Sequence, residues 1–514
     1  MPLARPFRRH IHLSKAAIRG TQSQLSTRQQ RRTARWSEPL DYRPAGQRNQ
    51  MDAIRRGGDM SARSRSGCPS LHRIVDAVDG GLCRIKLPGG ELLAAQAAAI
   101  ADCARRHGSG VIEFTNRANL QLRGIRRTDE DALIDALTAA GLGPLRTQGT
   151  DAGTVDPTAT SARDDRRNVM ISPTAGIDPQ ALLDTRPLAD ELLRAMQLEP
   201  GFDALSPKFA ILIDGGEGLA ELDHPHDIWL AALPAASGAR FAVGLAGTPP
   251  SHRDDGSLVG VVEEAHAAAT VIALTHAFLE LRQAEIGRMR ELVAHTGADA
   301  IVEHAQARAR IASASQADLG NWRRRGVDSA SRLGAHPQRD GAYCYVGFQP
   351  PLGRIDADRL DRLAELSREA GCSRLRLTPW QGALLPDVEP GRVAMTLSRL
   401  RDLDLICDAQ QPLARLIACA GSTGCARSPV DTKADAMVLA AGVLPPGMVH
   451  VSGCPRSCAA PTAAAYTLLA VAPHLYDLYR RDDRPGLGQC IAHRLSIQEA
   501  AVVLRAVGQE TVDA

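Results

Sequence analysis

The sequence contains few aromatic residues and no long apolar stretch. Phe, Trp and Tyr make up only 3% of the 514 residues, so the cores must be built from Ala, Leu, Val and Ile. No stretch reaches the roughly 18 consecutive apolar residues of a membrane-spanning helix, which predicts a protein without a membrane partner. No apolar stretch follows the arginine pair at residues 8–9, so we expect no secretory signal and predict a cytoplasmic protein.

The sequence also lacks the basic excess that is typical of nucleic-acid-binding proteins, because its net charge is only +3. Residues 1–65 hold 15 Lys and Arg against four Asp and Glu, and their Arg-, Gln- and Ser-rich composition predicts disorder. This segment is either a basic arm for an acidic partner or a dispensable tail, with Met51 or Met60 as alternative starts. The composition favours the tail, and we predict no nucleic-acid partner.

A repeated pattern runs through the rest of the chain. Residues 82–90 (LCRIKLPGG) and 345–353 (YVGFQPPLG) match at a constant offset of 263 residues, and a helix-forming stretch follows each, at 91–106 and 354–370. Each helix is followed by glycine and then by strand-forming residues. We interpret this as an internal repeat of strand–helix–strand units, the alternative being two unrelated units of a common type.

Each repeated unit is followed by a larger mixed segment, which predicts an α+β chain with the order A–B–A′–B′. The predicted A parts are residues 66–145 and 335–395, and the predicted B parts are 165–325 and 400–510. Two further segments lack a periodic apolar pattern: residues 147–166 are expected to form a loop, and residues 309–340 a linker between the halves.

Four of the eleven cysteines form a group in the last predicted part. Cys419 and Cys425 are separated by five residues, and Cys454 and Cys458 by three, with Gly421, Gly424 and Gly453 among the small residues around them. Small residues suit an iron–sulfur cluster, because backbone N–H groups must approach the sulfur atoms. Structural zinc is the nearest alternative, although zinc loops are usually shorter, and disulfides are a third. The pattern favours a four-cysteine cluster.

The cysteine spacing behind two A–B repeats resembles the sulfite and nitrite reductase superfamily, over most of residues 68–505. Within it, three phrases resemble the precorrin-3B synthase branch: residues 80–91 (GGLCRIKLPGGE), 116–124 (NRANLQLRG) and 449–454 (VHVSGC). The resemblance implies tandem ferredoxin-like half-domains, each with an α/β domain, and a [4Fe–4S] cluster on Cys419, Cys425, Cys454 and Cys458. In the reductases this cluster lies next to sirohaem, and the fourth cysteine bridges the two.

The resemblance also assigns basic residues to the binding of tetrapyrrole carboxylates. Arg117 matches the first basic position and Arg167 the second, while Lys208 keeps one of two lysines that face the small anion in the reductases. Ala210 replaces the other lysine, which weakens the case for anion reduction. Arg117, Arg123, Arg167 and Lys208 are the candidate tetrapyrrole-binding residues, because a guanidinium pairs bidentately with a carboxylate; the alternative for each is a surface charge or a local ion pair.

The resemblance implies hydroxylation of precorrin-3A at C20 with closure of a γ-lactone, using O2 and electrons. It further implies a mononuclear non-haem iron, whose ligands no spacing identifies; His336 and His450 flank relevant regions, but a lone histidine is usually structural. No Gly-x-Gly-x-x-Gly follows a strand, so NAD(P)H is expected to act through a separate reductase or ferredoxin. The alternative functions are a sirohaem-dependent sulfite or nitrite reductase and a non-enzymatic metal-binding protein.

Overall fold

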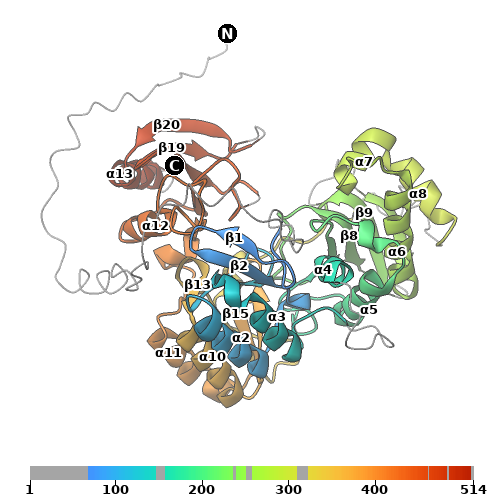
Figure 1. Cartoon of the computed structure of the whole chain (residues 1–514), viewed down its shortest axis with the longest axis horizontal. Helices are drawn as coiled ribbons and strands as arrows, with labels where there is room; N and C mark the ends of the chain where they lie inside the picture. The colour runs from blue at the N-terminus through green and yellow to red at the C-terminus, as the bar shows by residue number, and fades with distance from the viewer. Residues whose placement is uncertain are drawn as a thin grey trace, which may run out of the picture. The chain divides into compact units, whose positions relative to one another are not determined.

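The structure is a computed structural model that describes residues 68–145, 157–234, 239–250, 258–309, 322–460, 462–482 and 486–510 (Figure 1). The expectations for residues 1–65 lie outside this part of the chain. Across these ranges, no helix combines the length and the apolar character needed to cross a membrane.

Two five-stranded antiparallel sheets form the ferredoxin-like half-domains. In spatial order, the first contains β1 (Val75–Ala77), β2 (Gly80–Ile85), β5 (Leu120–Ile125), β4 (Val111–Phe114) and β13 (Arg354–Asp356). The second contains β11 (Gly334–Pro337), β12 (Cys344–Phe348), β15 (Gly382–Val388), β14 (Arg374–Thr378) and β3 (Glu91–Leu93). The fifth strand of each sheet therefore comes from the other half of the chain.

The two sheets have the same strand order, which confirms the internal repeat. β3 and β13 begin at Glu91 and Arg354, and the helices that follow them, α2 (Ala94–His107) and α10 (Ala357–Glu369), begin at Ala94 and Ala357. Both pairs of starting residues are 263 positions apart, as the sequence match predicts. The exchange of β3 and β13 was not predicted, because the pattern of one strand does not say which sheet will accept it.

The exchange explains why the repeat has glycine at two equivalent positions. Gly90 has φ of +73°, and a Cβ atom there would lie 2.5 Å from the carbonyl oxygen of Leu377. Gly353 has φ of +68°, and its Cβ would lie 3.1 Å from the carbonyl oxygen of Phe114. Each glycine therefore lets the chain pass closely over a strand of the opposite half-domain in a left-handed conformation, which glycine adopts at little cost.

One hydrophobic core unites both half-domains. α2 and α10 lie side by side, and α3 (Glu130–Ala139) and α11 (Val393–Asp402) complete the helices around this core (Figure 1). The buried side chains include Ile100 of α2, Leu363 of α10 and strand residues of both sheets. Asp356 caps α10 by accepting a hydrogen bond from the backbone N–H of Arg359, which fixes the start of that helix.

The two B segments also share one topology. The first sheet has the order β6 (Val169–Ile171), β7 (Ile211–Asp214), β8 (His226–Leu233), β9 (Arg240–Gly247) and β10 (Leu258–Glu263). The second has the order β16 (Leu416–Ala418), β17 (Val449–Ser452), β18 (Tyr466–Ala472), β19 (Leu475–Arg480) and β20 (Gln489–Leu495). In both sheets the first three strands are parallel and the last two pairings are antiparallel.

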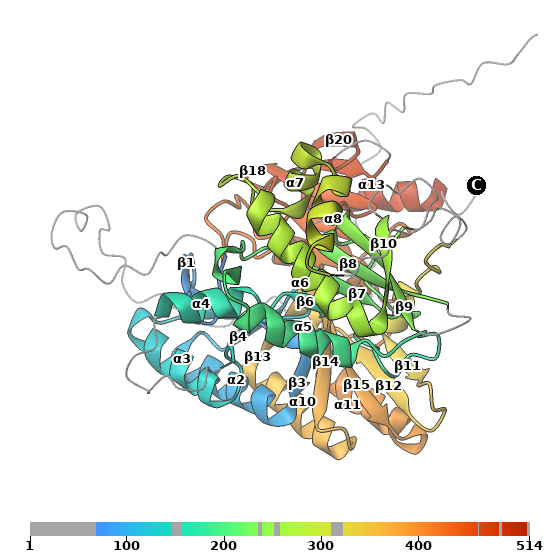
Figure 2. The same ribbon diagram turned by 90° about the vertical axis from the view of Figure 1, so that its right-hand side faces the viewer.

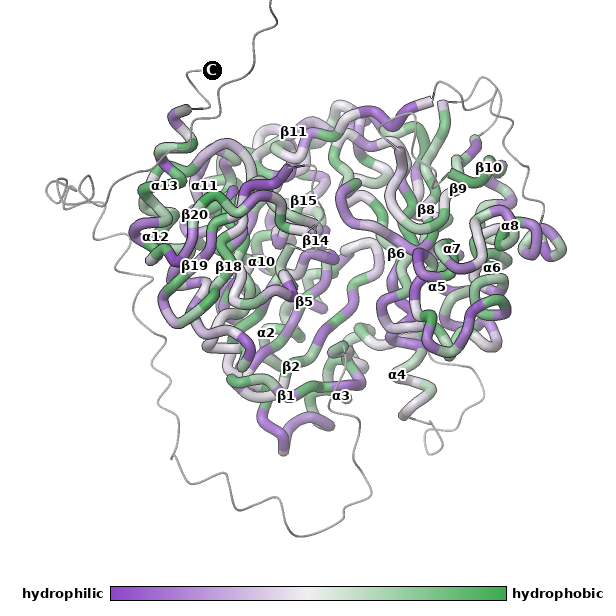
Figure 3. The backbone as a smooth tube through the Cα atoms, turned by 90° about the horizontal axis from the view of Figure 1, so that it is seen from above, coloured by the Kyte–Doolittle hydropathy of each residue, from purple (hydrophilic) through white to green (hydrophobic). Residues whose placement is uncertain are grey.

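Helices cover these two sheets. In the first B segment they are α5 (Arg186–Leu198), α6 (Glu264–Leu281), α7 (Met289–Thr296) and α8 (Ala298–Gln306), while α4 (Pro157–Asp165) packs against α5 (Figure 2). In the second they are α12 (Thr432–Ala440) and α13 (Ile497–Glu510). All eight residues of β8 are buried, as expected for a central strand covered on both faces. Figure 3 colours this strand by the hydropathy of its residues.

Two expectations about irregular segments need correction. Residues 157–165 form α4 rather than loop, because Asp164 and Asp165 bind the backbone N–H of Leu71 and the guanidinium of Arg73, and these tertiary contacts outweigh a weak local preference. The expected linker includes β11, which pairs with β12 from Gly334 onward. Residues 147–156 and 310–321 of these two segments lie outside the described part.

Candidate metal centre and adjoining cavity

The four candidate cysteines follow two neighbouring parallel strands. Cys419 comes directly after β16, and Cys454 comes two residues after β17 ends. β16 and β17 are paired in parallel, so their carboxyl ends lie at the same edge of the sheet. This edge is where ligands bind in open parallel sheets, and the two cysteine loops therefore meet there.

The loop glycines permit the close approach that the sequence predicts. Gly421 has φ of +68°, and a Cβ on it would lie 2.8 Å from the backbone nitrogen of Thr432. A Cβ on Gly424 would lie 2.2 Å from the guanidinium of Arg123, and one on Gly453 would lie 2.0 Å from the Ser428 hydroxyl. The backbone N–H of Gly453 donates a hydrogen bond to Cys419 Sγ at 3.3 Å, which is the contact that stabilises a ligating sulfur.

The four sulfur atoms face a common cavity with a volume of about 690 Å³. Burial and the neighbouring sulfurs of Cys454, Cys419 and Cys425 raise the pKa of Cys458. A tetrahedral zinc ion would hold thiolates about 3.8 Å apart, since Zn–S bonds are about 2.3 Å long. Among the described residues, no three of the four cysteine sulfurs lie within 4.8 Å of one another, which is wider than a tetrahedral zinc site requires.

The first half of the chain supports the cysteine loops. Asn116, in the turn between β4 and β5, donates from its side-chain amide to the carbonyl oxygens of Cys458 and Ala459. Arg123 of β5 donates to the carbonyl oxygen of Gly424 at 2.8 Å and is held by ion pairs to Asp79 and Glu113. Half-domain 1 therefore contacts the candidate metal centre, although the four cysteines all belong to the second B segment.

Glu113 is the centre of a buried ion network beneath the loops. Burial alone would raise its pKa, but the positive charges of Lys433, Arg354 and Arg123 outweigh that effect and lower the pKa to about 2. Lys433 follows Cys425 on the chain, and its Nζ donates to the carbonyl oxygen of Leu352 at 2.7 Å. Burial lowers the pKa of Lys433 to about 8, while Glu113 opposes that shift.

Several guanidinium groups line the cavity without an acidic partner. Arg84, Arg427 and Arg456 form no ion pair with a described residue, and sequence reasoning missed all three. Arg84 is half-buried, its pKa is lowered by burial, and the thiol of Cys458 and the carboxylate of Asp165 oppose that shift. Only the alternation of β2 could have indicated Arg84, because it follows Cys83 and points to the opposite face.

The predicted basic residues separate into different surroundings. Arg117 and Arg167 line a small cavity of about 30 Å³, together with Asn119 and His226. Burial lowers the pKa of Arg117 to about 10, with Arg288 and Arg84 adding their repulsion, and its guanidinium has no ion pair in the described ranges. Arg117 is thus a cation that an anionic ligand would stabilise.

Arg167 and Lys208 have other surroundings. Arg167 is buried, forms an ion pair with Asp164 at 3.0 Å and donates to the carbonyl oxygens of Leu142 and Lys86. Lys208 is exposed, whereas Ala210 is buried and its backbone N–H donates to Asp227. Arg123, Arg117, Arg167 and Lys208 are therefore not brought together around one cavity: Arg123 alone of the four lines the cavity of the cysteines.

The two histidines noted in the sequence occupy strands. His450 is buried in β17, burial lowers its pKa to about 4, and its Nε2 has no hydrogen-bond partner within the described ranges. His336 lies in β11, with its Nε2 2.8 Å from the carbonyl oxygen of Leu333. Neither histidine lines the cavity of the cysteines.

The equivalent edge of the first B sheet is closed by an ion pair instead of cysteines. Asp214, the last residue of β7, is bound by the Arg324 guanidinium at 2.5 and 2.8 Å, and Arg324 also donates to the carbonyl oxygen of Glu217. No cysteine occurs between residues 104 and 343. The candidate metal centre is therefore confined to the second half of the chain.

Comparisons with known proteins agree with this architecture. The family described as "Nitrite/Sulfite reductase ferredoxin-like half domain" matches residues 77–140 and 336–403. The family described as "Nitrite and sulphite reductase 4Fe-4S domain" matches residues 162–312, which contain no cysteine. The matches thus cover both half-domains and the first B segment, in the predicted order.

The chain is similar to proteins with two different activities and to one solved structure. The chloroplastic ferredoxin–nitrite reductase of Zea mays is 30% identical over 76% of this chain and 69% of its own length. A precorrin-3B synthase of a Sinorhizobium species is 28% identical over 82% of this chain and 84% of its own length. The NirA protein of Mycobacterium tuberculosis has the same fold, with a TM-score of 0.65, 19% identity and 84% coverage of both chains.

These findings confirm the predicted α+β fold with two ferredoxin-like half-domains. The family's 4Fe-4S domain implies a [4Fe–4S] cluster, and the geometry of the cysteine loops fits such a group. The chain therefore belongs to the nitrite/sulfite reductase superfamily and is an oxidoreductase of that superfamily.

Proposed function

We propose that this protein is a precorrin-3B synthase, which hydroxylates precorrin-3A at C20 and closes a γ-lactone in aerobic cobalamin biosynthesis. The observation that carries the proposal is a cavity beside the four cysteines that is lined by guanidinium groups without acidic partners. The similarity to a precorrin-3B synthase over 84% of that protein's length supports it.

The chemistry of the substrate suits this cavity. Precorrin-3A is an acidic tetrapyrrole, and its peripheral carboxylates need several cations around a broad pocket. Arg84 lines this cavity, whereas Arg117 lines the separate cavity of about 30 Å³. Both are half-buried, and the pKa of each is lowered by burial, so carboxylates would restore favourable charge pairing. Arg427 and Arg456 are exposed at the cavity of the cysteines and can pair bidentately with further carboxylates.

The remaining basic candidates take supporting roles in this proposal. Arg123 and Arg167 already have acidic partners, so they hold the walls of the site, Arg123 at the cluster loop and Arg167 beside Arg117. Lys208 is exposed, and it can reach only a ligand group that extends out of the protein. The four proposed cluster ligands remain Cys419, Cys425, Cys454 and Cys458.

The balance of the reaction requires an electron donor. One oxygen atom of O2 enters the substrate and the other leaves as water, so the reaction consumes two electrons and two protons. A [4Fe–4S] cluster supplies electrons singly when bound. We propose that the donor is a ferredoxin or a separate NAD(P)H-dependent reductase, because the relatives include enzymes named for ferredoxin.

A sirohaem-dependent nitrite or sulfite reductase is the second candidate. It is favoured by the number of nitrite reductases among the relatives, such as those of Zea mays and Arabidopsis thaliana at 30% and 29% identity. Against it stands the basic set for a small anion: Ala210 has no charge and Lys208 is exposed.

The deciding experiment uses protein purified without oxygen, with its iron and sulfide measured. It is incubated with precorrin-3A, O2 and a reductant, and the product mass is followed; in parallel, nitrite or sulfite consumption is measured with reduced ferredoxin. Oxygen incorporation without anion consumption supports the proposal. A sirohaem spectrum with anion reduction, or one zinc and no sulfide, refutes it.

A matched pair of variants links the activity to the site. Cys458→Ser should abolish oxygen incorporation, because one cluster ligand is lost. Cys344→Ser, which removes a half-buried thiol in β12, should leave the activity unchanged. Full activity of Cys458→Ser would contradict the proposed ligand set.

A further inference from the structure

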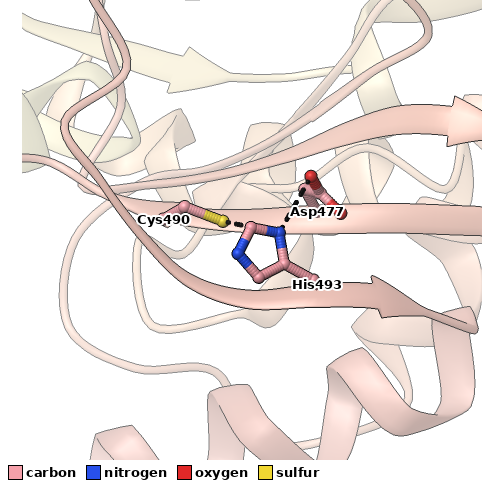
Figure 4. Close-up of side chains that lie close together, drawn as sticks. All are labelled: Asp477, Cys490 and His493. Carbon is pink, nitrogen blue, oxygen red and sulfur yellow. Dashed lines mark hydrogen bonds and ion pairs between the residues drawn. The ribbon is translucent and has the colours of Figure 1, made fainter.

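A second group of possible metal ligands lies outside the cavity of the cysteines. Asp477 of β19 and Cys490 and His493 of β20 point toward one another (Figure 4). Their ligand atoms all lie within 4.8 Å of one another, and Asp477 and Cys490 are half-buried while His493 is exposed. We propose that Asp477, Cys490 and His493 bind one zinc ion on this sheet, with the fourth position open to water.

The distances between the ligand atoms match a tetrahedral zinc site. His493 Nδ1 lies 3.2 Å from Asp477 Oδ2 and 3.5 Å from Cys490 Sγ. Bonds of about 2.0 Å from zinc to nitrogen and oxygen and about 2.3 Å to sulfur set N···O at about 3.3 Å and N···S at about 3.5 Å. Both contacts meet at the same ring nitrogen, so the group is not arranged as a nucleophile–histidine–carboxylate relay, which would use opposite nitrogens.

The strand geometry explains how residues three positions apart reach one face. In a regular strand, Cys490 and His493 would point to opposite faces of the sheet. Tyr479 pairs with Cys490 and Leu478 pairs with Ala492, so one extra residue is inserted between them in β20. Such a bulge redirects the following side chains, and bulges commonly lie next to functional sites.

The surrounding contacts orient the ligands. The backbone N–H of Arg494 donates to Asp477 Oδ1 at 2.9 Å, which leaves Oδ2 directed at the group. An outer hydrogen bond of this kind fixes a ligating carboxylate. Arg494 itself has φ of +51°, so the chain holds a conformation that is uncommon for arginine at this point.

The donor set selects the metal. A thiolate and an imidazole favour a borderline-soft ion such as zinc over Mg²⁺ or Ca²⁺, which prefer oxygen ligands alone. The thiol of Cys490 donates to the carbonyl oxygen of Ala492 at 3.4 Å. Zinc binds cysteine as the thiolate, so binding releases the thiol proton.

The site would connect an edge strand to its neighbour. β20 is the last strand of its sheet, and α13 follows it directly. A zinc ion shared by β19 and β20 would oppose the fraying of this edge and of the helix that follows it. The ion lies outside the cavity of the four cysteines, none of whose lining residues belongs to this group.

The test uses full-length protein with complete iron and sulfide content. The protein is incubated with excess zinc chloride, desalted and analysed for metals, and its zinc-edge X-ray absorption is recorded. We expect one zinc per chain, with one sulfur at about 2.3 Å and nitrogen or oxygen neighbours at about 2.0 Å. No bound zinc, or zinc with two or more sulfur neighbours, overturns the proposal.

Variants test the assignment. Cys490→Ser and His493→Ala should each weaken zinc binding by at least about 100-fold, since loss of an outer-sphere partner alone costs about 10–100-fold. Asp477→Asn preserves the size of the side chain and should also weaken binding. Cys344→Ser and His295→Ala are matched controls away from the group and should retain zinc. Equal zinc affinity of all five variants refutes the site.

Discussion

Replacing Arg123 tests how half-domain 1 supports the cysteine loop. The side chain is only 3% exposed and contacts Asp79, Glu113 and the carbonyl oxygen of Gly424. Removing one partner of a buried ion pair costs about 3–5 kcal/mol. Because Glu113 keeps Arg354 and Lys433, and Asp79 is 27% exposed, we expect about 3 kcal/mol for Arg123→Gln.

Arg123→Gln should also destabilise the loop that contains Gly424. The hydrogen bond from the guanidinium to the Gly424 carbonyl oxygen contributes about 2 kcal/mol to the stability of this loop, so its loss should increase the opening equilibrium of the loop roughly 30-fold. Native-state amide exchange of peptides that cover residues 419–428 measures this opening. Exchange should accelerate by about 30-fold in Arg123→Gln, and iron and sulfide should be lost faster in air.

The matched control is Arg126→Gln. Arg126 follows β5, is 53% exposed and pairs with Asp129 on the surface, so its loss should change stability by less than about 1 kcal/mol and leave the loop unchanged. If amide exchange in residues 419–428 is the same in Arg123→Gln and the parent protein, the proposed support of the loop is wrong.

Three further predictions concern the substrate, the ion network and the repeat. Arg117→Ala should lower kcat/KM for the proposed tetrapyrrole substrate by about 10–100-fold, since a charge-assisted hydrogen bond contributes about 1.5–3 kcal/mol. Arg117→Lys should recover part of the loss, and steady-state kinetics that show no change would exclude Arg117 from binding. Burial opposes ionisation of Glu113, but Lys433, Arg354 and Arg123 outweigh it and lower the pKa to about 2. Ionised Glu113 should therefore add about 3 kcal/mol to the free energy of unfolding above pH 4.5, and this contribution is lost as the pH falls toward 2. Glu113→Gln should reduce the change of the urea midpoint with pH across this range, and an unchanged profile would contradict the network. Gly90→Ala should destabilise the protein by about 1–3 kcal/mol more than Gly110→Ala, because both glycines have positive φ but only a Cβ on Gly90 would meet a carbonyl oxygen. Equal melting temperatures of the two variants would show that a side chain fits at Gly90.

Local patterns were sufficient to predict most elements of the repeat. The helices predicted at 91–106 and 354–370 correspond to α2 and α10, although the first three residues of each predicted helix form β3 and β13 instead. These elements have strong local signals, since alternation, glycine stops and an Asp cap lie within each segment. α4 was missed because its helix depends on contacts of Asp164 and Asp165 with distant residues.

The cysteine loops were predictable for a similar reason, whereas their surroundings were not. The spacing of Cys419 and Cys425 and the positive φ of Gly421 are features of one loop. Gly424, by contrast, leaves room for the guanidinium of the distant Arg123. Arg167 pairs with Asp164 and Lys208 is exposed because of the way the first B segment packs. The spacing of residues in the sequence does not indicate this packing. Arg84 was missed because a single arginine in a strand carries no local signal.

The sequence by itself determined the order of the parts, the internal repeat and the two cysteine loops, because each depends on residues close together in the chain. Only the tertiary structure decided that β3 and β13 exchange sheets, that Arg123 supports Gly424, and that Asp477 meets Cys490 and His493. The physical reason is the same in all three cases: the contact joins separate segments, and its energy exists only after the strands have paired and the side chains are buried.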